Sequence, residues 1–188
     1  MKSVRRRVPA LLLVALAGLL AACGGEREIV THAETEGIFV NVGPLDYQVQ
    51  ISRALNPAAP DDAAYLVGVP STVPAPTREE TWFAIFLRVE NNGEAAALSA
   101  DDVEIVDTLE KVYRPIEFED ENVFAYRPTT LEPDDALPRP NSAASSSPIQ
   151  GSLMLFKVTL DSLANRPLEL RIKAPDGSGA VGVVNLDV

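Results

Sequence analysis

The sequence of 188 residues predicts an all-β protein, an antiparallel β-sandwich of about seven to nine strands. Residues 45–52 (LDYQVQIS) alternate apolar and polar side chains, which is the period of a half-buried strand. Several more short segments rich in strand-forming residues are separated by turn residues. Helix signals are weak by comparison, because the one stretch of good helix formers, 94–106, ends in Val, Ile and Val.

Residues 81–91 (TWFAIFLRVEN) predict the central strand of the sandwich. One face of this strand is apolar along its whole length: Phe83, Ile85, Leu87 and Val89. The opposite face begins with Trp82, Ala84 and Phe86 and then becomes charged, so we expect both faces to be covered near the start of the strand. Trp82 is interpreted as a core residue that supplies packing area, rather than as a platform for a sugar.

The remaining strands are shorter, and two long loops interrupt them. Further strands are predicted at 102–108, 111–116, 122–126, 151–160, 168–174 and 180–188. The first two flank Leu109 and Glu110 and predict a hairpin. Segments 56–80 and 127–148 are rich in proline, which cannot donate to a strand ladder, so we expect surface loops there.

The first 22 residues have the pattern of a secretory signal peptide. Four basic residues precede an apolar run, Val8 to Ala22, which ends at Cys23, the only cysteine. A transmembrane anchor is the alternative, but it needs roughly 20 apolar residues, and this run is shorter and has Pro9 near its start. Leu20-Ala21-Ala22-Cys23 resembles the lipobox of bacterial lipoproteins. The resemblance implies cleavage after residue 22 and a diacylglyceryl thioether on Cys23.

These features divide the chain into three parts. Residues 1–22 are the predicted lipoprotein signal peptide, residues 23–36 a lipidated flexible tether, and residues 37–188 the β-sandwich domain. The lipid on Cys23 would hold the protein on the cell membrane, facing outside the cytoplasm, at the cell surface or in the periplasm. Because Cys23 is used for attachment, we expect no disulfide.

The domain also resembles a known family. The features that carry the likeness are the strand ending at Val89-Glu90-Asn91, the hairpin 107–113, and the strand 151–156 followed by Pro167 and an alternating strand. They resemble the telokin-like, immunoglobulin-fold domains common in bacterial lipoproteins, often called the DUF4352-like group. The likeness covers roughly residues 36–188 and implies an immunoglobulin-like β-sandwich in the cell envelope. It carries over no catalytic residues, and the hairpin has Glu110-Lys111 where relatives usually have a glycine.

Composition argues against several function classes. The formal net charge is −11; the predicted signal peptide holds four of the 16 basic residues and none of the 27 acidic ones, so the remainder carries −15. Such an acidic surface disfavours nucleic acid. The only histidine, His32, lies in the predicted tether, which argues against histidine-dependent nucleophilic catalysis and against zinc or copper sites. We therefore expect that the protein is not an enzyme, and that it has no catalytic residues, no cofactor and no metal site.

The acidic residues leave two other possibilities open. They gather in one cluster and three pairs: Glu117, Glu119, Asp120 and Glu121; Asp61-Asp62; Asp101-Asp102; and Asp134-Asp135. A calcium- or cation-binding accessory protein using these loops is the alternative function, although no known calcium-loop spacing is present. A carboxylate hydrolase is the third and weakest reading. The favoured prediction is a membrane-anchored, non-catalytic binding or structural module that meets an envelope partner through strand edges or the proline-rich loops.

Overall fold

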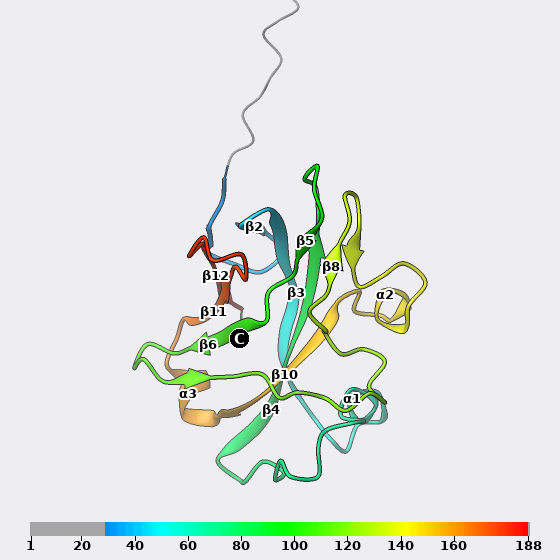
Figure 1. The fold of residues 1–188 in the computed structure, drawn as a ribbon. Coiled ribbons are helices and arrows are strands. Elements are labelled where there is room, and N and C mark those ends of the chain that lie inside the picture. The colour runs from blue at the N-terminus through cyan, green and yellow to red at the C-terminus, as the bar shows by residue number, and fades with distance from the viewer. Residues whose placement is uncertain (1–28, 188) are drawn as a thin grey trace, which may run out of the picture.

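The computed structural model describes residues 29–187 and shows two β-sheets packed face to face (Figure 1). The first sheet, called sheet A, has the strand order β1-β12-β11-β6-β7, and the second, sheet B, has the order β10-β4-β3-β2, with β9 added beside β4. A small third sheet joins β5 to β8. The predicted β-sandwich is confirmed. Within the described residues no helix is both long and apolar enough to span a membrane.

The strands of four residues or more carry the sandwich, and the other elements are short. The longer strands are β2 (Phe39–Val42), β3 (Leu45–Leu55), β4 (Glu80–Glu90), β6 (Asp102–Val106), β10 (Ser152–Thr159), β11 (Leu168–Lys173) and β12 (Val181–Leu186). Two-residue strands are β1 (His32–Ala33), β5 (Ala97–Leu98), β7 (Val112–Tyr113), β8 (Thr130–Leu131) and β9 (Ala136–Leu137). Three short helices complete the order: α1 (Pro60–Tyr65), α2 (Ala143–Ser146) and α3 (Leu160–Ala164).

Strand β4 is the centre of sheet B, as its sequence predicts. It pairs antiparallel with β10 along one side and with β3 along the other, where the register shifts between Val49 and Ile51. Its four inward side chains are fully buried in the core between the sheets: Phe83, Ile85, Leu87 and Val89. Burial of a large apolar side chain is worth about 1.5–3 kcal/mol, so this strand contributes much of the stability.

Sheet A is built on β11, whose alternation predicts one buried and one exposed face. Its inner side chains Leu168, Leu170 and Ile172 are fully buried, and the strand pairs antiparallel with both β12 and β6. The predicted hairpin joins β6 to β7. At its turn, Glu110 has a φ of +61°, the left-handed conformation that glycine adopts most readily.

The predicted tether, residues 23–36, is too long at its C-terminal end, because the segment just before residue 37 is part of the folded domain. Val30 packs against the core, and His32 and Ala33 form β1, which pairs parallel with β12. The Val30 carbonyl also accepts a hydrogen bond from the Asn41 N–H in β2, at 2.6 Å. This segment therefore joins the edges of both sheets, and the domain includes residues 30–36. The signal peptide and the rest of the tether, residues 23–28, lie outside the described residues.

The first proline-rich loop, 56–80, packs against the outer face of sheet B, whereas the second, 127–148, contributes Leu131 and Leu137 to the core between the sheets. Trp82, Ala84 and Phe86 of β4 are buried there, as predicted, in a second apolar cluster. Tyr65 of α1 contacts Phe86 edge-to-face, with ring centroids 5.0 Å apart. Arg53 of β3 holds α1 in place through an ion pair with Asp62. The predicted strand 122–126 forms only an isolated bridge, Ala125 to Leu153.

Candidate functional site

The predicted lipid-attachment residue, Cys23, lies outside the described residues, so its modification stays a prediction. His32 lies in β1, with 47% of its side chain exposed and 3.5 Å from the Glu34 carboxylate. This histidine does not line the cleft described below.

The acidic clusters do not assemble into a metal site. No group of three or more His, Cys, Asp or Glu side chains within residues 29–187 is placed to hold a metal ion. One member of each pair is engaged by a basic residue instead: Asp62 by Arg53, Asp102 by Lys173 at 3.1 Å, and Asp135 by Arg139 at 3.7 Å. The hydrogen bond from Arg53 lowers the pKa of Asp62, as expected for a paired carboxylate. The calcium alternative therefore gains no support from the geometry.

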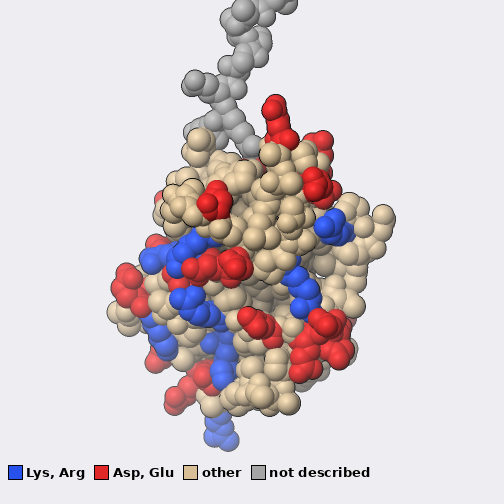
Figure 2. All heavy atoms as spheres, in the orientation of Figure 1, with Lys and Arg blue, Asp and Glu red and all other residues tan. Residues whose placement is uncertain are grey.

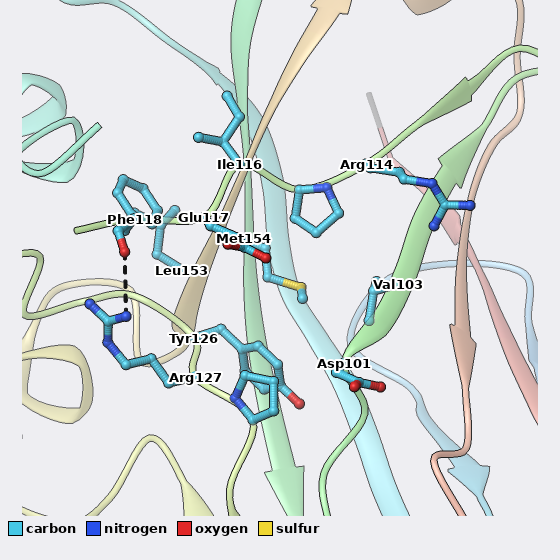
Figure 3. A pocket seen from close by; sticks show the side chains of 12 residues that line it. Asp101, Val103, Arg114, Ile116, Glu117, Phe118, Tyr126, Arg127, Leu153 and Met154 are labelled. Atoms are coloured by element: carbon cyan, nitrogen blue, oxygen red, sulfur yellow. Dashed lines mark hydrogen bonds between the residues drawn. The ribbon is translucent and has the colours of Figure 1, made fainter. Parts of the chain in front are cut away.

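A cleft of about 420 Å³ opens between the two sheets, where β10 forms the edge of sheet B (Figure 3). We call it the β6–β10 cleft. Four parts of the chain line it: the start of β6, the start of β10, and the segments 114–118 and 126–128. This volume is within the range of small-molecule sites.

Main-chain hydrogen bonds to β10 fix both walls of the cleft. The Ile116 N–H donates to the Leu155 carbonyl at 2.7 Å. The Tyr126 N–H donates to the Leu153 carbonyl at 2.8 Å, and the Leu153 N–H donates to the Phe124 carbonyl at 2.7 Å. The edge of β10 thus holds the walls, so both walls are fixed by hydrogen bonds within the chain itself.

The floor of the cleft is apolar and includes a fixed tyrosine. Leu153 and Met154 come from β10 and Val103 from β6, and all three are buried. The Tyr126 hydroxyl donates to the Ala100 carbonyl at 2.8 Å, while the Ala100 N–H donates to the Tyr47 hydroxyl at 2.8 Å.

Both of these tyrosines are uncharged at neutral pH. Burial raises the pKa of Tyr47 to about 12. Burial also raises the pKa of Tyr126 far above its usual range. Because its hydroxyl is fixed and neutral, Tyr126 presents a rigid aromatic ring to the cleft.

Charged side chains of both signs surround the mouth of the cleft, which is visible as a hollow between them in Figure 2. Arg114 lies 3.2 Å from Asp102 and 3.3 Å from Glu104. The Arg127 guanidinium donates to the Phe118 and Glu119 carbonyls, at 3.4 and 2.7 Å. Both arginines therefore already have acceptors.

The two acidic residues of the rim differ from the arginines. Asp101 and Glu117 are exposed, and neither forms an ion pair or a side-chain hydrogen bond with another residue of the described range. In Figure 3 the Glu117 side chain extends toward the middle of the cleft, whereas the Arg127 guanidinium reaches back to Phe118. The charge that the rim leaves uncompensated is negative.

A second polar cluster lies at the end of the sandwich, beside α3. The Ser162 hydroxyl donates to the buried Asp107 carboxylate at 2.7 Å and contacts the Tyr113 hydroxyl at 2.6 Å. Burial opposes ionisation of Asp107, but the bonds from Ser162 and from two backbone N–H groups outweigh it and lower its pKa. Lys111 donates to Thr159 at 3.0 Å, and its hydrogen bond with Tyr113 raises its pKa. A lysine held protonated cannot act as the base for a hydroxyl nucleophile.

Sequence reasoning singled out Asp101 and Glu117 as possible cation ligands, and the structure brings both to the rim of one cleft. It did not identify the cleft itself. The lining residues are separated by up to 53 positions and meet only through packing of β10 against segments 114–118 and 124–128. A partial indication of a cleft wall is present in the sequence, because segment 114–118 mixes large apolar and charged residues in an otherwise polar stretch.

Comparison with known proteins supports the fold. No protein-family model matches the chain, and no curated protein matches it in sequence, so the DUF4352-like assignment is unconfirmed. The YjhA protein of Bacillus subtilis is similar in structure, with a TM-score of 0.51 and 11% identity over 82% of this chain and 99% of its own. YcdA of Bacillus subtilis, a candidate lipoprotein, has a TM-score of 0.53 and 10% identity over 85% of this chain. This chain spans only 39% of YcdA.

Proposed function

We propose that this protein is a lipid-anchored, extracytoplasmic, non-catalytic binding module whose ligand site is the β6–β10 cleft. The cleft carries the proposal: it has about 420 Å³ of space, an apolar floor and walls already fixed by main-chain hydrogen bonds. Largely preformed, mostly apolar concavities with a few polar groups are the usual form of small-molecule sites. The first proline-rich loop, 56–80, is less available to a partner because it packs against sheet B.

The anchor rests on the sequence 20–23 and on the likeness to a candidate lipoprotein. One acyl chain binds a membrane only marginally, whereas two or more hold a protein there stably. We expect labelled palmitate to be incorporated into the wild-type chain in vivo and not into Cys23→Ala. Equal labelling of the two chains would contradict the anchor without affecting the proposal for the cleft.

Three observations favour a non-catalytic role. His32 is in an edge strand away from the cleft, and Lys111, the lysine that contacts Thr159, has a raised pKa. Among the residues of the described range that line the cleft, no serine, threonine, cysteine or histidine offers a nucleophile.

The binding role is tested by filling the cleft. Pro128 is exposed on the rim, so Pro128→Trp would place an indole ring over the opening with little cost to the core. Pro133→Trp is the matched control, because Pro133 is also exposed but does not line the cleft. Each full-length chain would be purified from native membranes, and the small molecules it retains would be extracted and analysed by mass spectrometry.

The expected result is a compound that copurifies with the wild type and with Pro133→Trp and is depleted from Pro128→Trp. Circular dichroism and melting temperature would establish that all three chains are equally folded. The same extract from all three folded chains would contradict a binding role for the cleft.

A further inference from the structure

We infer that the ligand of the β6–β10 cleft is a small organic cation, an ammonium or guanidinium group joined to an apolar body. This inference rests on the proposed function and adds the chemical class of the ligand. It follows from three features of the cleft: its apolar floor, the unequal pairing of the charges on its rim, and the aromatic ring of Tyr126.

The interior of the cleft selects an apolar body. Val103, Leu153 and Met154 form its base, and Ile116 lines a wall beside them. Transfer of apolar surface from water onto such a base is favourable, and the free energy gained is roughly proportional to the area buried. The Met154 thioether is polarizable and unbranched, so it can adjust to an aromatic or an aliphatic group. A fully hydrated ion without an apolar part would leave this surface uncovered.

The rim selects a positive charge. Arg114 is held by Asp102 and Glu104, and Arg127 by the Phe118 and Glu119 carbonyls and by Asp120 at 3.6 Å. An anionic ligand would have to compete with these acceptors for each guanidinium. A cation meets Asp101 and Glu117, whose carboxylates have no basic partner in the described part of the chain.

An aromatic ring reinforces the same choice. Tyr126 lines the cleft, and cations are attracted to the faces of aromatic rings, whereas the Phe118 ring packs against the outer cluster of sheet B. The Tyr126 hydroxyl already donates to Ala100, so the ring is what this residue offers to a ligand. An apolar body against Met154, with its cationic group between Glu117 and the Tyr126 ring, would match the apolar, acidic and aromatic parts of the lining (Figure 3).

The test is a charge series built on one apolar body: phenethylamine, phenethyl alcohol and phenylpropionate. Each would be titrated by calorimetry into the full chain in nanodiscs, with empty nanodiscs as the blank for partitioning. We expect phenethylamine to bind about tenfold more tightly than the alcohol, and phenylpropionate more weakly than both. Glu117→Gln and Asp101→Asn should each weaken the amine about fivefold and leave the alcohol unchanged.

Glu121→Gln is the matched control, because Glu121 is exposed on the same loop and does not line the cleft. It should leave the affinity of the amine unchanged. Tightest binding by phenylpropionate, or equal binding of amine and alcohol with no effect of either rim variant, would overturn the cationic class while leaving a binding cleft in place. Absence of binding by all three probes would also overturn it. The role of the cleft itself is decided separately, by the copurification experiment with Pro128→Trp.

Discussion

The outer faces of the two sheets differ in polarity and in exposure to solvent. On sheet A, β11 presents Glu169, Arg171 and Lys173 to solvent, where they form ion pairs along the strand and with β6. On sheet B, the outward side chains Ala84 and Phe86 of β4 are fully buried beneath α1 and the loops. The outer face of sheet A is therefore charged and exposed, whereas the outer face of sheet B is apolar and covered by other segments of the chain.

This difference explains the long loops. A sandwich needs only its inner faces buried, so an apolar outer face requires a further cover. The proline-rich segment 56–80 provides part of it through Tyr65, and segment 114–126 provides another part through Ile116 and Phe124. Segment 114–128 then continues past the edge of β10, and the cleft forms where this cover meets the open side of the sandwich.

The largest expected effect is on the covered face. Phe86→Ala removes a fully buried ring that contacts Tyr65, and should lower the free energy of unfolding by about 3–5 kcal/mol in chemical denaturation. Phe83→Ala on the inner face of the same strand is the comparison, and a similar loss is expected. If Phe86→Ala cost less than about 1 kcal/mol while Phe83→Ala cost several, the loops would not form a true second core.

The next effect concerns the attachment of the cover. Asp62→Asn removes the charge that pairs with Arg53 and weakens the bond it accepts from the Asn56 N–H, 2.7 Å long. We expect a loss of about 2 kcal/mol, because hydrogen bonds to charged groups are worth more than neutral ones. Increased amide hydrogen exchange confined to residues 56–80 would accompany it. Unchanged stability together with unchanged exchange would show that α1 is held by apolar contacts alone.

The same pair predicts a pH dependence. The Arg53 hydrogen bond lowers the pKa of Asp62 in the folded state, so its stabilisation is fully present above the unfolded pKa of about 4. It is lost as the pH falls through the lower folded pKa. The difference in stability between wild type and Asp62→Asn should therefore be constant near neutrality and shrink below about pH 4. A difference that grew on acidification would contradict this assignment.

The smallest effect is expected on the charged face. Arg171→Gln breaks the pair with Glu169, 2.8 Å apart, in which both side chains are partly exposed. Such surface pairs are worth about 0.5 kcal/mol or less, and salt reduces them further. Denaturation midpoints at low and high salt would measure this. A loss as large as that of Asp62→Asn would remove the contrast between the two faces.

Much of this contrast could be predicted from local sequence. The alternation in β11 indicates one polar face, and the unbroken apolar start of β4 indicates cover on both sides; the structure confirms both. The hairpin around Glu110 was also predicted, because the flanking segments favour strands. These features depend on residues that are close in sequence. Successive side chains of a strand point to opposite faces, so the apolar pattern indicates directly which face is buried.

The features that could not be predicted depend on distant partners. Residues 30–33 lack a strand pattern. They are ordered by pairing with β12, which is distant in sequence, and by the hydrogen bond from Asn41 of β2. Polar composition favoured a tether for that reason. The cleft is likewise assembled from four separate segments, and which carboxylates of the rim stay unpaired depends on where Arg114 and Arg127 lie.

Amide chemical-shift mapping of phenethylamine on the isotope-labelled full chain in nanodiscs tests directly whether the β6–β10 cleft binds an organic cation. Saturable shifts are expected at Val103, Tyr126 and Met154, with the outer face of β11 unaffected. Shifts that gather instead on Glu169 and Arg171 of β11, or that stay linear and scattered over the surface, would contradict a cation site in the β6–β10 cleft.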